Sequence, residues 1–550
     1  MRVLLIVSSF NSLSQKVYVR LKEKNYIVSV DYALSDELMI KEVQRFKPDI
    51  ILCPFLNKFI PKQIFEKTPT FIVHPGVIGD RGSNSLDLAI LENKKTWGVV
   101  ILKANENFDG GDIYSYKNFT MPINKSKASI YRNEVANCAI KAIDELFINL
   151  KNKEFTPIKQ ILNPLHKKIT QNDRKINWQE DSSDIIIKKI NASDSSPGVK
   201  DNLLGKECYL YCAFKEESLT AKPKEIIAKR DGAICIGTID KAIWITHLKE
   251  KDYFKLPATY VLKDKLKGIK ENRIPLVLED THIDTFYELR VQKDDEIAYL
   301  HFNFHNGAMS TTQCIRLKYA IDYLKQECKV LVLMGAEDFF SNGIHLNILE
   351  DSKKQGEDGW SNINAINDVV KSIIFSPEII TVTSFGKNAG AGGVFLGLAS
   401  DFIVINDEVV LNPHYKTLAL TGSEYHTYSL AKRVGETKAQ EIIDKCLPIG
   451  SKEAQKIGLV DIVFEDKSYK KDLKNFTKSL TKDLDWFYDF CEKKEEYLDK
   501  NSEYINSCKE KELKLMYNQF WNKDSNFHTL RQKFVYKKKA LETPKRLKEI

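Results

Sequence analysis

His74 and Asp109 are the residues of the N-terminal part whose types and positions best suit proton transfer. His74 follows an apolar run, 70–73, and precedes a Pro-Gly pair. Asp109 lies in the glycine-rich turn 108–112, with the sequence FDGGD. A histidine and a carboxylate on loops at the ends of strands can exchange a proton, which is the requirement of general acid–base catalysis. Taken alone, the pattern favours a structural histidine over a catalytic one.

Two glycine-rich stretches mark the second half of the chain. The first covers 340–346 (FSNGIHL) and the second covers 385–393 (FGKNAGAGG). Glycine lets a backbone approach a ligand closely and leaves N–H groups able to bind an oxyanion. Each stretch by itself is typical of a tight turn near the end of a strand.

Strands and helices alternate in the elements that must position His74 and Asp109. Apolar runs at 2–7, 27–31 and 49–53 predict buried strands, and amphipathic stretches at 14–24 and 36–46 predict helices between them. Continuous Val/Ile/Leu strands separated by such helices predict a parallel sheet. The first turn lacks the GxGxxG pattern, so no dinucleotide fingerprint is present.

The predicted fold class is α/β in both halves of the chain. A second strand–helix pattern begins near residue 286, and 466–550 has helical spacing of apolar and charged residues. Segments 151–173 and 250–283 are predicted to be linkers. The predicted domains are a Rossmann-like catalytic domain at 1–160, a small β-rich barrel at 174–255, an α/β domain at 284–465 and a helical C-terminal extension at 466–550.

Composition excludes several classes of protein. The 550 residues are 43% hydrophobic and 29% charged with a net charge of +8, which fits a globular chain and does not demand nucleic acid. No apolar run is long enough to span a bilayer and no leader is visible, so we expect a cytoplasmic protein with no membrane partner. The ten cysteines are dispersed without a CxxC pair, and we expect free thiols and no metal.

The region around His74 and Asp109 resembles the N10-formyltetrahydrofolate-dependent transferases, notably methionyl-tRNA formyltransferase. The residues that carry the resemblance are the pattern PDIILCPF…HPG…RG…SLDLAI…WGVVIL…FDGGDI. The resemblance implies that His74 is the catalytic histidine and Asp109 the catalytic aspartate. The asparagine of the family falls on Ile72, which disfavours an amine as the formyl acceptor. The resemblance continues into 174–250 as the small C-terminal barrel of the family.

The two glycine-rich stretches together resemble the crotonase (enoyl-CoA hydratase/isomerase) superfamily. This implies that the N–H groups of Ile344 and Gly392 form an oxyanion hole for the thioester carbonyl of a coenzyme A ester. The two glutamates of the hydratases fall on Phe395 and Tyr415, so the usual addition of water is excluded. Tyr415 takes an acid/base position of the superfamily, and Glu424 follows it in the polar segment GSEY.

The fusion of these two halves resembles the HypX/HoxX family of hydrogenase maturation proteins along nearly the whole chain. The resemblance includes the segments FNSLxQ, HPGxxGDRG, NGAMST, FSNGIHLN, NPHY and GSEY. It implies transfer of a formyl group from N10-formyltetrahydrofolate to coenzyme A, then breakdown of formyl-CoA to carbon monoxide and CoA for a [NiFe]-hydrogenase. Tyr415 and Glu424 would serve the second step, and the implied partners are small-molecule substrates and the hydrogenase maturation machinery.

The folate is expected beside the end of the 49–56 strand and the turn at 8–15. Asn11 and Gln15 offer amide contacts there, and Arg132 and Ser195 are further folate-binding candidates. Each of these four residues is as well explained by a structural role.

Two other functions stay open at the level of sequence. One is a formyltransferase that acts on a sugar nucleotide or another amine, with a non-catalytic CoA-binding crotonase-like module. The other is an inactive scaffold that binds a CoA ester or a hydrogenase subunit. Ile72 and the Tyr415/Glu424 replacement disfavour the first, and the presence of both His74 and Asp109 disfavours the second.

Overall fold

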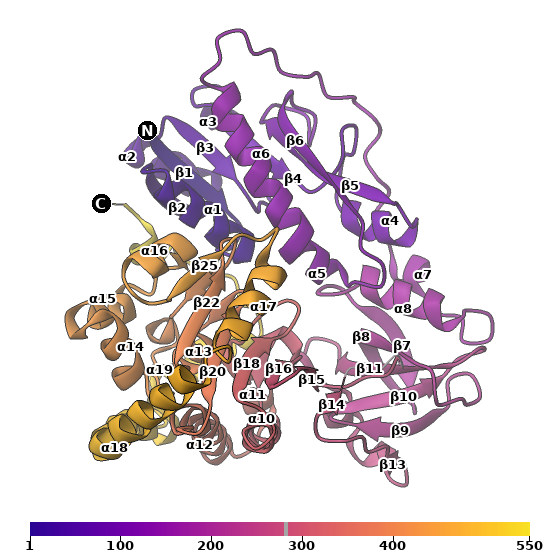
Figure 1. Cartoon of the computed structure of the whole chain (residues 1–550). Helices are drawn as coiled ribbons and strands as arrows, with labels where there is room; N and C mark the ends of the chain where they lie inside the picture. The colour runs from indigo at the N-terminus through magenta and orange to yellow at the C-terminus, as the bar shows by residue number, and fades with distance from the viewer. Residues whose placement is uncertain (280–283, 550) are drawn as a thin grey trace. The chain divides into compact units, whose positions relative to one another are not determined.

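The computed structural model describes residues 1–279 and 284–549, and the chain forms two compact units (Figure 1). The first unit contains Met1–Arg273 and the described residues of Ile283–Phe286 and Ala540–Ile550. The second contains Tyr287–Lys539 and the described residues of Ile274–His282. Each unit carries one of the two predicted catalytic constellations.

A six-stranded sheet in the order β2-β1-β3-β4-β5-β6 forms the centre of the first unit. Its strands are β1 (Arg2–Val7), β2 (Ile27–Tyr32), β3 (Ile50–Cys53), β4 (Thr70–His74), β5 (Thr96–Lys103) and β6 (Ile113–Thr120). The parallel pairing predicted for β1, β2 and β3 is confirmed and extends to β4, whereas β5 and β6 pair antiparallel. The connection between β5 and β6 is a short loop, which suits an antiparallel hairpin because a parallel pair needs a long crossover.

Helices pack beside this sheet as the apolar periodicity predicts. They are α1 (Ser12–Glu23), α2 (Asp36–Phe46), α3 (Lys62–Phe65), α4 (Ser85–Leu91), α5 (Lys127–Ile130) and α6 (Ala136–Asn149). The sequence predicts one helix over 128–150, but a π-helical turn, η1 (Tyr131–Val135), separates α5 from α6. Such turns cost regular hydrogen bonds and are frequent at functional sites.

A second sheet of seven strands follows in the same unit, in the order β13-β9-β10-β11-β8-β7 with β12 paired to β11. Its elements are α7 (Gln171–Arg174), α8 (Ser183–Ala192), β7 (Val199–Leu203), β8 (Lys206–Glu216), β9 (Ile226–Arg230), β10 (Ala233–Gly237), β11 (Ala242–Lys249), β12 (Lys255–Pro257), α9 (Ala258–Leu262) and β13 (Lys270–Glu271). The prediction of a linker over 250–283 is wrong for 255–271. Apolar residues such as Leu256, Val261 and Leu266 are buried there between the lysines.

The second unit is built on a seven-stranded sheet in the order β14-β15-β16-β18-β20-β22-β25. The strands are β14 (Leu278–Glu279), β15 (Leu289–Asp294), β16 (Ile297–Phe302), β18 (Val330–Gly335), β20 (Ile380–Phe385), β22 (Phe402–Asn406) and β25 (Ile462–Phe464). The helices around it are α10 (Thr311–Leu324), α11 (Leu346–Asp351), α12 (Gln355–Ile374), α13 (Gly392–Gly397), α14 (His426–Val434), α15 (Glu436–Lys445) and α16 (Ser451–Lys456). This arrangement confirms the second strand–helix pattern that the sequence predicts from about residue 286.

Three helices follow: α17 (Tyr469–Ser479), α18 (Leu484–Trp521) and α19 (Asn526–Val535). The long helix α18 packs on α12 and α14 (Figure 1). Buried side chains of α18 such as Ile505 and Met516 join the main hydrophobic core of the unit. Among the residues described, no helix is both long enough and apolar enough to cross a membrane.

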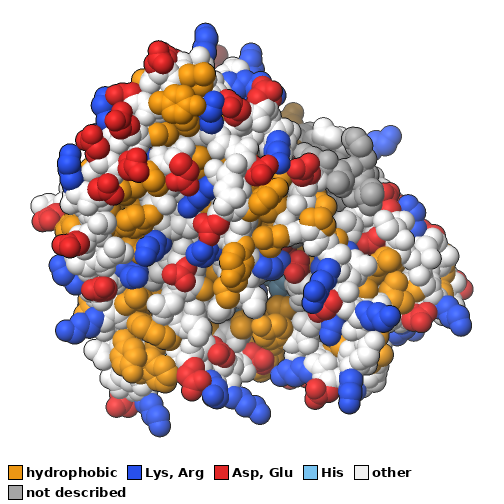
Figure 2. All heavy atoms as spheres, turned by 60° about the horizontal axis from the view of Figure 1, so that its bottom comes forward, with side chains coloured by type: hydrophobic (Ala, Val, Ile, Leu, Met, Phe, Trp, Pro, Cys, Tyr) orange, Lys and Arg blue, Asp and Glu red, His pale blue; other side chains and the backbone are white. Residues whose placement is uncertain are grey.

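Charged side chains of both signs are interspersed over the face shown in Figure 2. This agrees with the sequence, in which Lys and Arg exceed Asp and Glu by only a small margin. All ten cysteines are free thiols, which confirms the prediction that they form no disulfides.

The segment after residue 539 returns to the first unit and lies beside β2 (Figure 1). The Thr543 hydroxyl donates a hydrogen bond to Asp31 Oδ1 (2.7 Å) and accepts one from the Tyr32 backbone N–H (2.8 Å). Asp31 and Thr543 are both buried, so these bonds satisfy groups that water does not reach.

We predict that Thr543→Val lowers the free energy of unfolding by about 1–3 kcal/mol, because it removes the partner of the Tyr32 N–H and leaves the buried Asp31 carboxylate with only its longer contact to Lys548. Urea denaturation of the whole chain measures the change. Thr481→Val is the control, since its hydroxyl bonds only to a helix carbonyl at the surface. Equal stability of the two variants would contradict the prediction.

Candidate active sites

The structure brings His74 and Asp109 together. His74 is the last residue of β4 and is buried. Asp109 comes from the loop between β5 and β6, and its Oδ2 lies 3.5 Å from His74 Nδ1. The same oxygen accepts a hydrogen bond from the Gly82 N–H at 3.1 Å, which fixes the carboxylate beside the imidazole.

A second carboxylate, Asp80, lies on the other side of the His74 ring. Its Oδ2 is 2.6 Å from His74 Nε2, and its Oδ1 is 2.5 Å from His166 Nε2. Burial raises the pKa of Asp80, but hydrogen bonds from His74, Ser85 and His166 outweigh burial and hold this pKa below its usual value. Sequence patterns did not identify Asp80 as a site residue, although it lies in the HPGxxGDRG segment.

The segment 158–166, predicted as part of a linker, is a component of this site. Gln160 accepts from the Gly79 N–H (3.0 Å) and donates to the Asp109 carbonyl (3.2 Å). Asn163 donates to the Gly79 carbonyl (3.0 Å), and the His166 N–H donates to the Arg81 carbonyl (3.0 Å). The segment therefore supplies partners to loop backbone that no strand pairs, which is why the prediction of a free linker fails here.

Three of the four folate-binding candidates lie near one another. Asn11 caps α1 by accepting from the Ser14 N–H (3.0 Å), and its side chain also hydrogen-bonds the Tyr131 hydroxyl. Gln15 donates to the Phe10 carbonyl (2.9 Å). Arg132 follows Tyr131 in the π-helical turn η1.

The loop after β3 reaches the same region. The rings of Phe55 and Tyr131 lie 6.3 Å apart, and the Ser8 N–H donates to the Phe55 carbonyl at 2.8 Å. Burial raises the pKa of Tyr131 to about 12, so it remains a neutral hydroxyl. The end of β3 and the turn after β1 therefore meet; that the pterin lies beside them stays a prediction.

Ser195 lies apart from these three in the sequence, at the end of α8. Its backbone is left-handed (φ 60°), and its N–H hydrogen-bonds Asp194. Burial raises the pKa of Asp194, but Lys255 and hydrogen bonds from Ser195 and Ser126 lower it to about 2. A clear structural role of the Ser195 backbone is thus to stabilise a buried carboxylate.

In the second unit, the structure joins Tyr415 and Glu424 directly. The Tyr415 hydroxyl donates to Glu424 Oε2 at 2.5 Å, and the Ser423 N–H donates to the same oxygen at 3.1 Å. Both side chains are buried, and burial raises the pKa of each. The ring of Phe395 stacks on Tyr415 with centroids 4.8 Å apart, so the two positions that carry glutamates in hydratases are in contact.

The predicted oxyanion-hole residue Gly392 faces Glu424. A Cβ added to Gly392 would lie only 2.2 Å from Glu424 Oε1, so no other residue type fits there without moving the carboxyl. A Cβ on Gly343, which precedes Ile344 in β19 (Gly343–Ile344), would lie 3.1 Å from the Gly392 nitrogen. The two glycine-rich stretches therefore meet beside the Tyr415–Glu424 pair.

A histidine and a glutamate that the sequence did not reveal complete this cluster. His426 packs against the rings of Phe395 and Tyr415, with centroids 5.4 Å from each. Its Nδ1 lies 3.3 Å from Glu512 Oε1, a carboxylate that α18 contributes. Burial lowers the pKa of His426, but the hydrogen bond and the charge of Glu512 more than offset it, so this pKa is raised.

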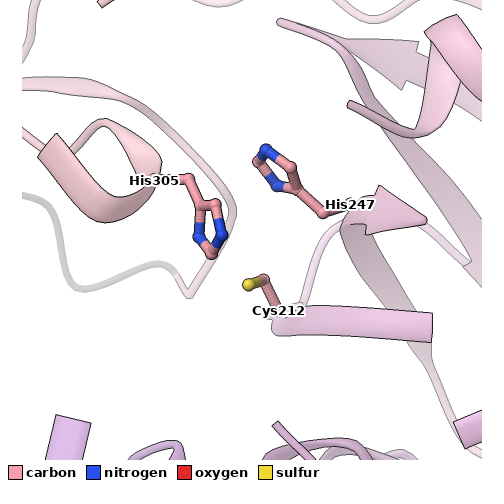
Figure 3. Close-up of side chains that lie close together, drawn as sticks. All are labelled: Cys212, His247 and His305. Atoms are coloured by element: carbon pink, nitrogen blue, oxygen red, sulfur yellow. The ribbon is translucent and has the colours of Figure 1, made fainter. Parts of the chain in front are cut away.

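Figure 3 shows a further thiol and imidazole in the first unit, Cys212 of β8 and His247 of β11. The Cys212 Sγ and a ring nitrogen of His247 lie within 4.8 Å. His305, also labelled there, belongs to the second unit, where Asn306 hydrogen-bonds its Nε2 at 2.8 Å. Two ligands from one unit are too few for a structural zinc site, which uses four.

Comparison with known proteins identifies the family. The chain is 34% identical to the hydrogenase maturation factor HoxX of Bradyrhizobium diazoefficiens over 554 residues, which cover 99% of this chain and 96% of HoxX. The chain belongs to the HypX/HoxX family. The crystal structure of HypX from Aquifex aeolicus in complex with tetrahydrofolic acid is 42% identical and superposes with a TM-score of 0.96 over 100% of this chain and 98% of that one.

The parts of this HypX/HoxX chain match separate enzyme families. Residues 11–143 match the formyl transferase family, 168–265 its C-terminal domain, and 293–540 the enoyl-CoA hydratase/isomerase family. Methionyl-tRNA formyltransferase of Campylobacter hominis is 29% identical over 162 residues, 29% of this chain and 52% of that protein. These matches confirm the predicted fold class, an α/β formyltransferase half fused to a crotonase-like half.

We predict that Glu512→Gln lowers the pKa of His426 in this HypX/HoxX protein, because it removes the largest interaction that opposes burial and leaves only the Ser423 carbonyl and the charge of Glu424 to oppose it. NMR titration of the histidine ring measures the shift. A raised pKa stabilises the fold fully below the unfolded value and loses that effect as the pH rises through the folded value. The stability difference from wild type should therefore be larger at pH 5 than at pH 9.

The control for this measurement is Glu510→Gln, which removes an exposed carboxylate from the same helix. This variant should leave the pKa of His426 unchanged. If Glu512→Gln also leaves the pKa of His426 unchanged, His426 and Glu512 are not electrostatically coupled.

Proposed function

We propose that the chain makes carbon monoxide for the active site of a [NiFe]-hydrogenase in two steps. The first unit transfers a formyl group from N10-formyltetrahydrofolate to the thiol of coenzyme A. The second unit breaks formyl-CoA into carbon monoxide and CoA. The observation that carries the proposal is the buried Tyr415–Glu424 pair, which occupies an acid/base position of a CoA-ester enzyme.

The first step needs a group that takes the proton of the attacking thiol and returns it to the departing nitrogen. The new C–S bond forms as the C–N bond to N10 breaks, and the proton moves from sulfur to N10. His74 can act as this group, and the catalytic candidate Asp109 lies 3.5 Å from its Nδ1. Once deprotonated, a thiol is a strong nucleophile at neutral pH, so the absence of the family asparagine at Ile72 is tolerable.

The folate and CoA are substrates in this proposal, and the residues present suit them. Asn11, Gln15 and Arg132 offer amide and guanidinium groups around the turn that follows β1 and the end of β3, where we place the pterin. Ser195 is a weaker folate contact because its backbone is engaged with Asp194. For formyl-CoA, the N–H groups of Ile344 and Gly392 would polarise the thioester carbonyl.

The second step removes the formyl proton and returns a proton to sulfur, so the C–H and C–S bonds break and no atom is added. A carboxylate with a raised pKa suits both transfers, because a group that titrates near the working pH is an efficient acid and base. Burial raises the pKa of Glu424, and the Tyr415 hydroxyl holds its carboxyl in place by a hydrogen bond. Phe395 stacks where the other hydratase glutamate would activate water, which supports decarbonylation over hydration.

The decisive experiment supplies the purified protein with N10-formyltetrahydrofolate and CoA and traps the gas with reduced haemoglobin. Formation of the carbonyl spectrum together with free tetrahydrofolate is the expected result. Formyl transfer to a sugar nucleotide or another amine, with no formyl-CoA and no carbon monoxide, would replace this proposal with the amine-formyltransferase alternative.

We predict that His74→Ala and Asp109→Ala slow formyl-CoA production by about 10²–10⁴-fold, the usual contribution of acid–base groups. Chromatography of the CoA esters measures the rate. Calorimetric titration with CoA should show unchanged binding, since both residues lie in the other unit. Production within about threefold of wild type would reject the assignment.

We predict that Tyr415→Phe and Glu424→Gln accumulate formyl-CoA and release little carbon monoxide. Both changes conserve volume, so a large effect must come from the lost hydroxyl or charge. The haemoglobin trap and CoA-ester chromatography are run on the same samples.

Tyr517→Phe and Glu510→Gln make the same chemical changes at exposed positions of α18 and serve as controls. Carbon monoxide at the wild-type rate from both site variants would make the Tyr415–Glu424 pair structural and place decarbonylation elsewhere.

A further inference from the structure

The His74 imidazole lies between two carboxylates, and its two nitrogens are not equivalent. Nε2 makes a hydrogen bond of 2.6 Å to Asp80. Nδ1 lies 3.5 Å from Asp109, which is a looser contact. A neutral imidazole carries one proton, and the shorter contact determines which nitrogen holds it.

Asp80 is an ionised carboxylate that is buried and accepts hydrogen bonds from two histidines. It is 5% exposed, and it accepts from both His74 and His166. An ionised carboxylate has no proton to donate, so its partner on Nε2 must be an N–H. A carboxylate in the same relation to a catalytic histidine holds the imidazole in one tautomer in serine proteases.

We infer that Asp80 is a positioning residue that holds the proton of neutral His74 on Nε2 and leaves Nδ1 as the nitrogen that exchanges a proton with the reactants. The inference rests on the proposed formyl transfer. The thiol proton moves to Nδ1 as the C–S bond forms, and Asp80 stabilises the imidazolium. The proton then leaves Nδ1 for N10 as the C–N bond breaks, which restores the neutral ring.

Gly76 and the segment 158–166 leave room for, and support, the hydrogen bond between His74 and Asp80. A Cβ added to Gly76 would lie 2.5 Å from His74 Nε2 and 2.3 Å from Asp80 Oδ2, so a side chain at this position would occupy the space of the hydrogen bond. The segment 158–166 holds Asp80 from the other side through His166 and through Gly79, the preceding residue.

The first experiment determines the tautomer. The protein is labelled with ¹⁵N-histidine, and the His74 signals are assigned by their loss in His74→Ala. The long-range ¹H–¹⁵N pattern of the neutral ring, recorded up to pH 9, should show protonated Nε2 and bare Nδ1. A proton on Nδ1 of the neutral ring would overturn the inference, whether or not the protein makes formyl-CoA.

The second experiment tests the consequence for the reaction. Asp80→Asn presents an amide that can donate to Nε2, so the proton of His74 should move to Nδ1. We predict a fall in kcat for formyl-CoA formation of about 10²–10⁴-fold with KM values within about threefold. Asp240→Asn makes the same change in the turn between β10 and β11, away from His74, and should leave kcat and the His74 spectrum as in wild type.

Gly76→Ala is a second variant. It keeps the side chains of His74 and Asp80, and its added methyl group should push the two apart. It should lower kcat, as Asp80→Asn does, and speed the exchange of the Nε2 proton with solvent. It provides the test if Asp80→Asn does not fold. A kcat within about threefold of wild type in a folded Asp80→Asn or Gly76→Ala would overturn the inference. If wild type makes no formyl-CoA but shows the Nε2 proton, the proposed function fails while the assignment of the tautomer stands.

Discussion

The short hydrogen bond between Tyr415 and Glu424 is the interaction on which the second unit depends. Two acidic groups share a site that water does not reach, and burial raises the pKa of both. Several features exist to hold them there: the Ser423 N–H, the missing side chain at Gly392 and the left-handed backbone of Glu424 (φ 63°). A non-glycine residue in that conformation costs on the order of 1–3 kcal/mol and persists only where packing determines it.

In the first unit, the pKa of a buried carboxyl group is shifted in the opposite direction. Asp80 is also buried, yet its pKa is held low because three side-chain donors surround it. The Tyr415 hydroxyl, the Ser423 N–H and the charge of His426 lower the pKa of Glu424, but its deeper burial and the negative charge of Glu512 outweigh them. One chain thus holds the pKa of one carboxylate below its usual value and that of another above it, and the difference lies in the depth of burial and in the donors and charges around each carboxylate.

Much of this could be predicted from local sequence. The strands and helices follow from apolar periodicity, and His74, Asp109 and the glycine-rich stretches follow from motifs. The rest depends on contacts between distant residues. Segment 158–166 lies in the stretch 151–173, which is rich in Lys, Asn and Pro and looks like a linker, and Glu512 lies in a run of Glu and Lys that resembles any solvated helix face. Only the tertiary fold distinguishes Glu512, which is 2% exposed, from Glu510 on the surface.

The return of the segment after residue 539 to β2 has a consequence for biosynthesis. A ribosome makes the strands of the first unit early, but the hydroxyl that satisfies Asp31 and Tyr32 is not available until Thr543 has left the exit tunnel. By then the whole second unit has been translated. The N-terminal half therefore reaches its final form only in a chain whose later half is already present, so truncated products of interrupted translation retain an incomplete edge at β2.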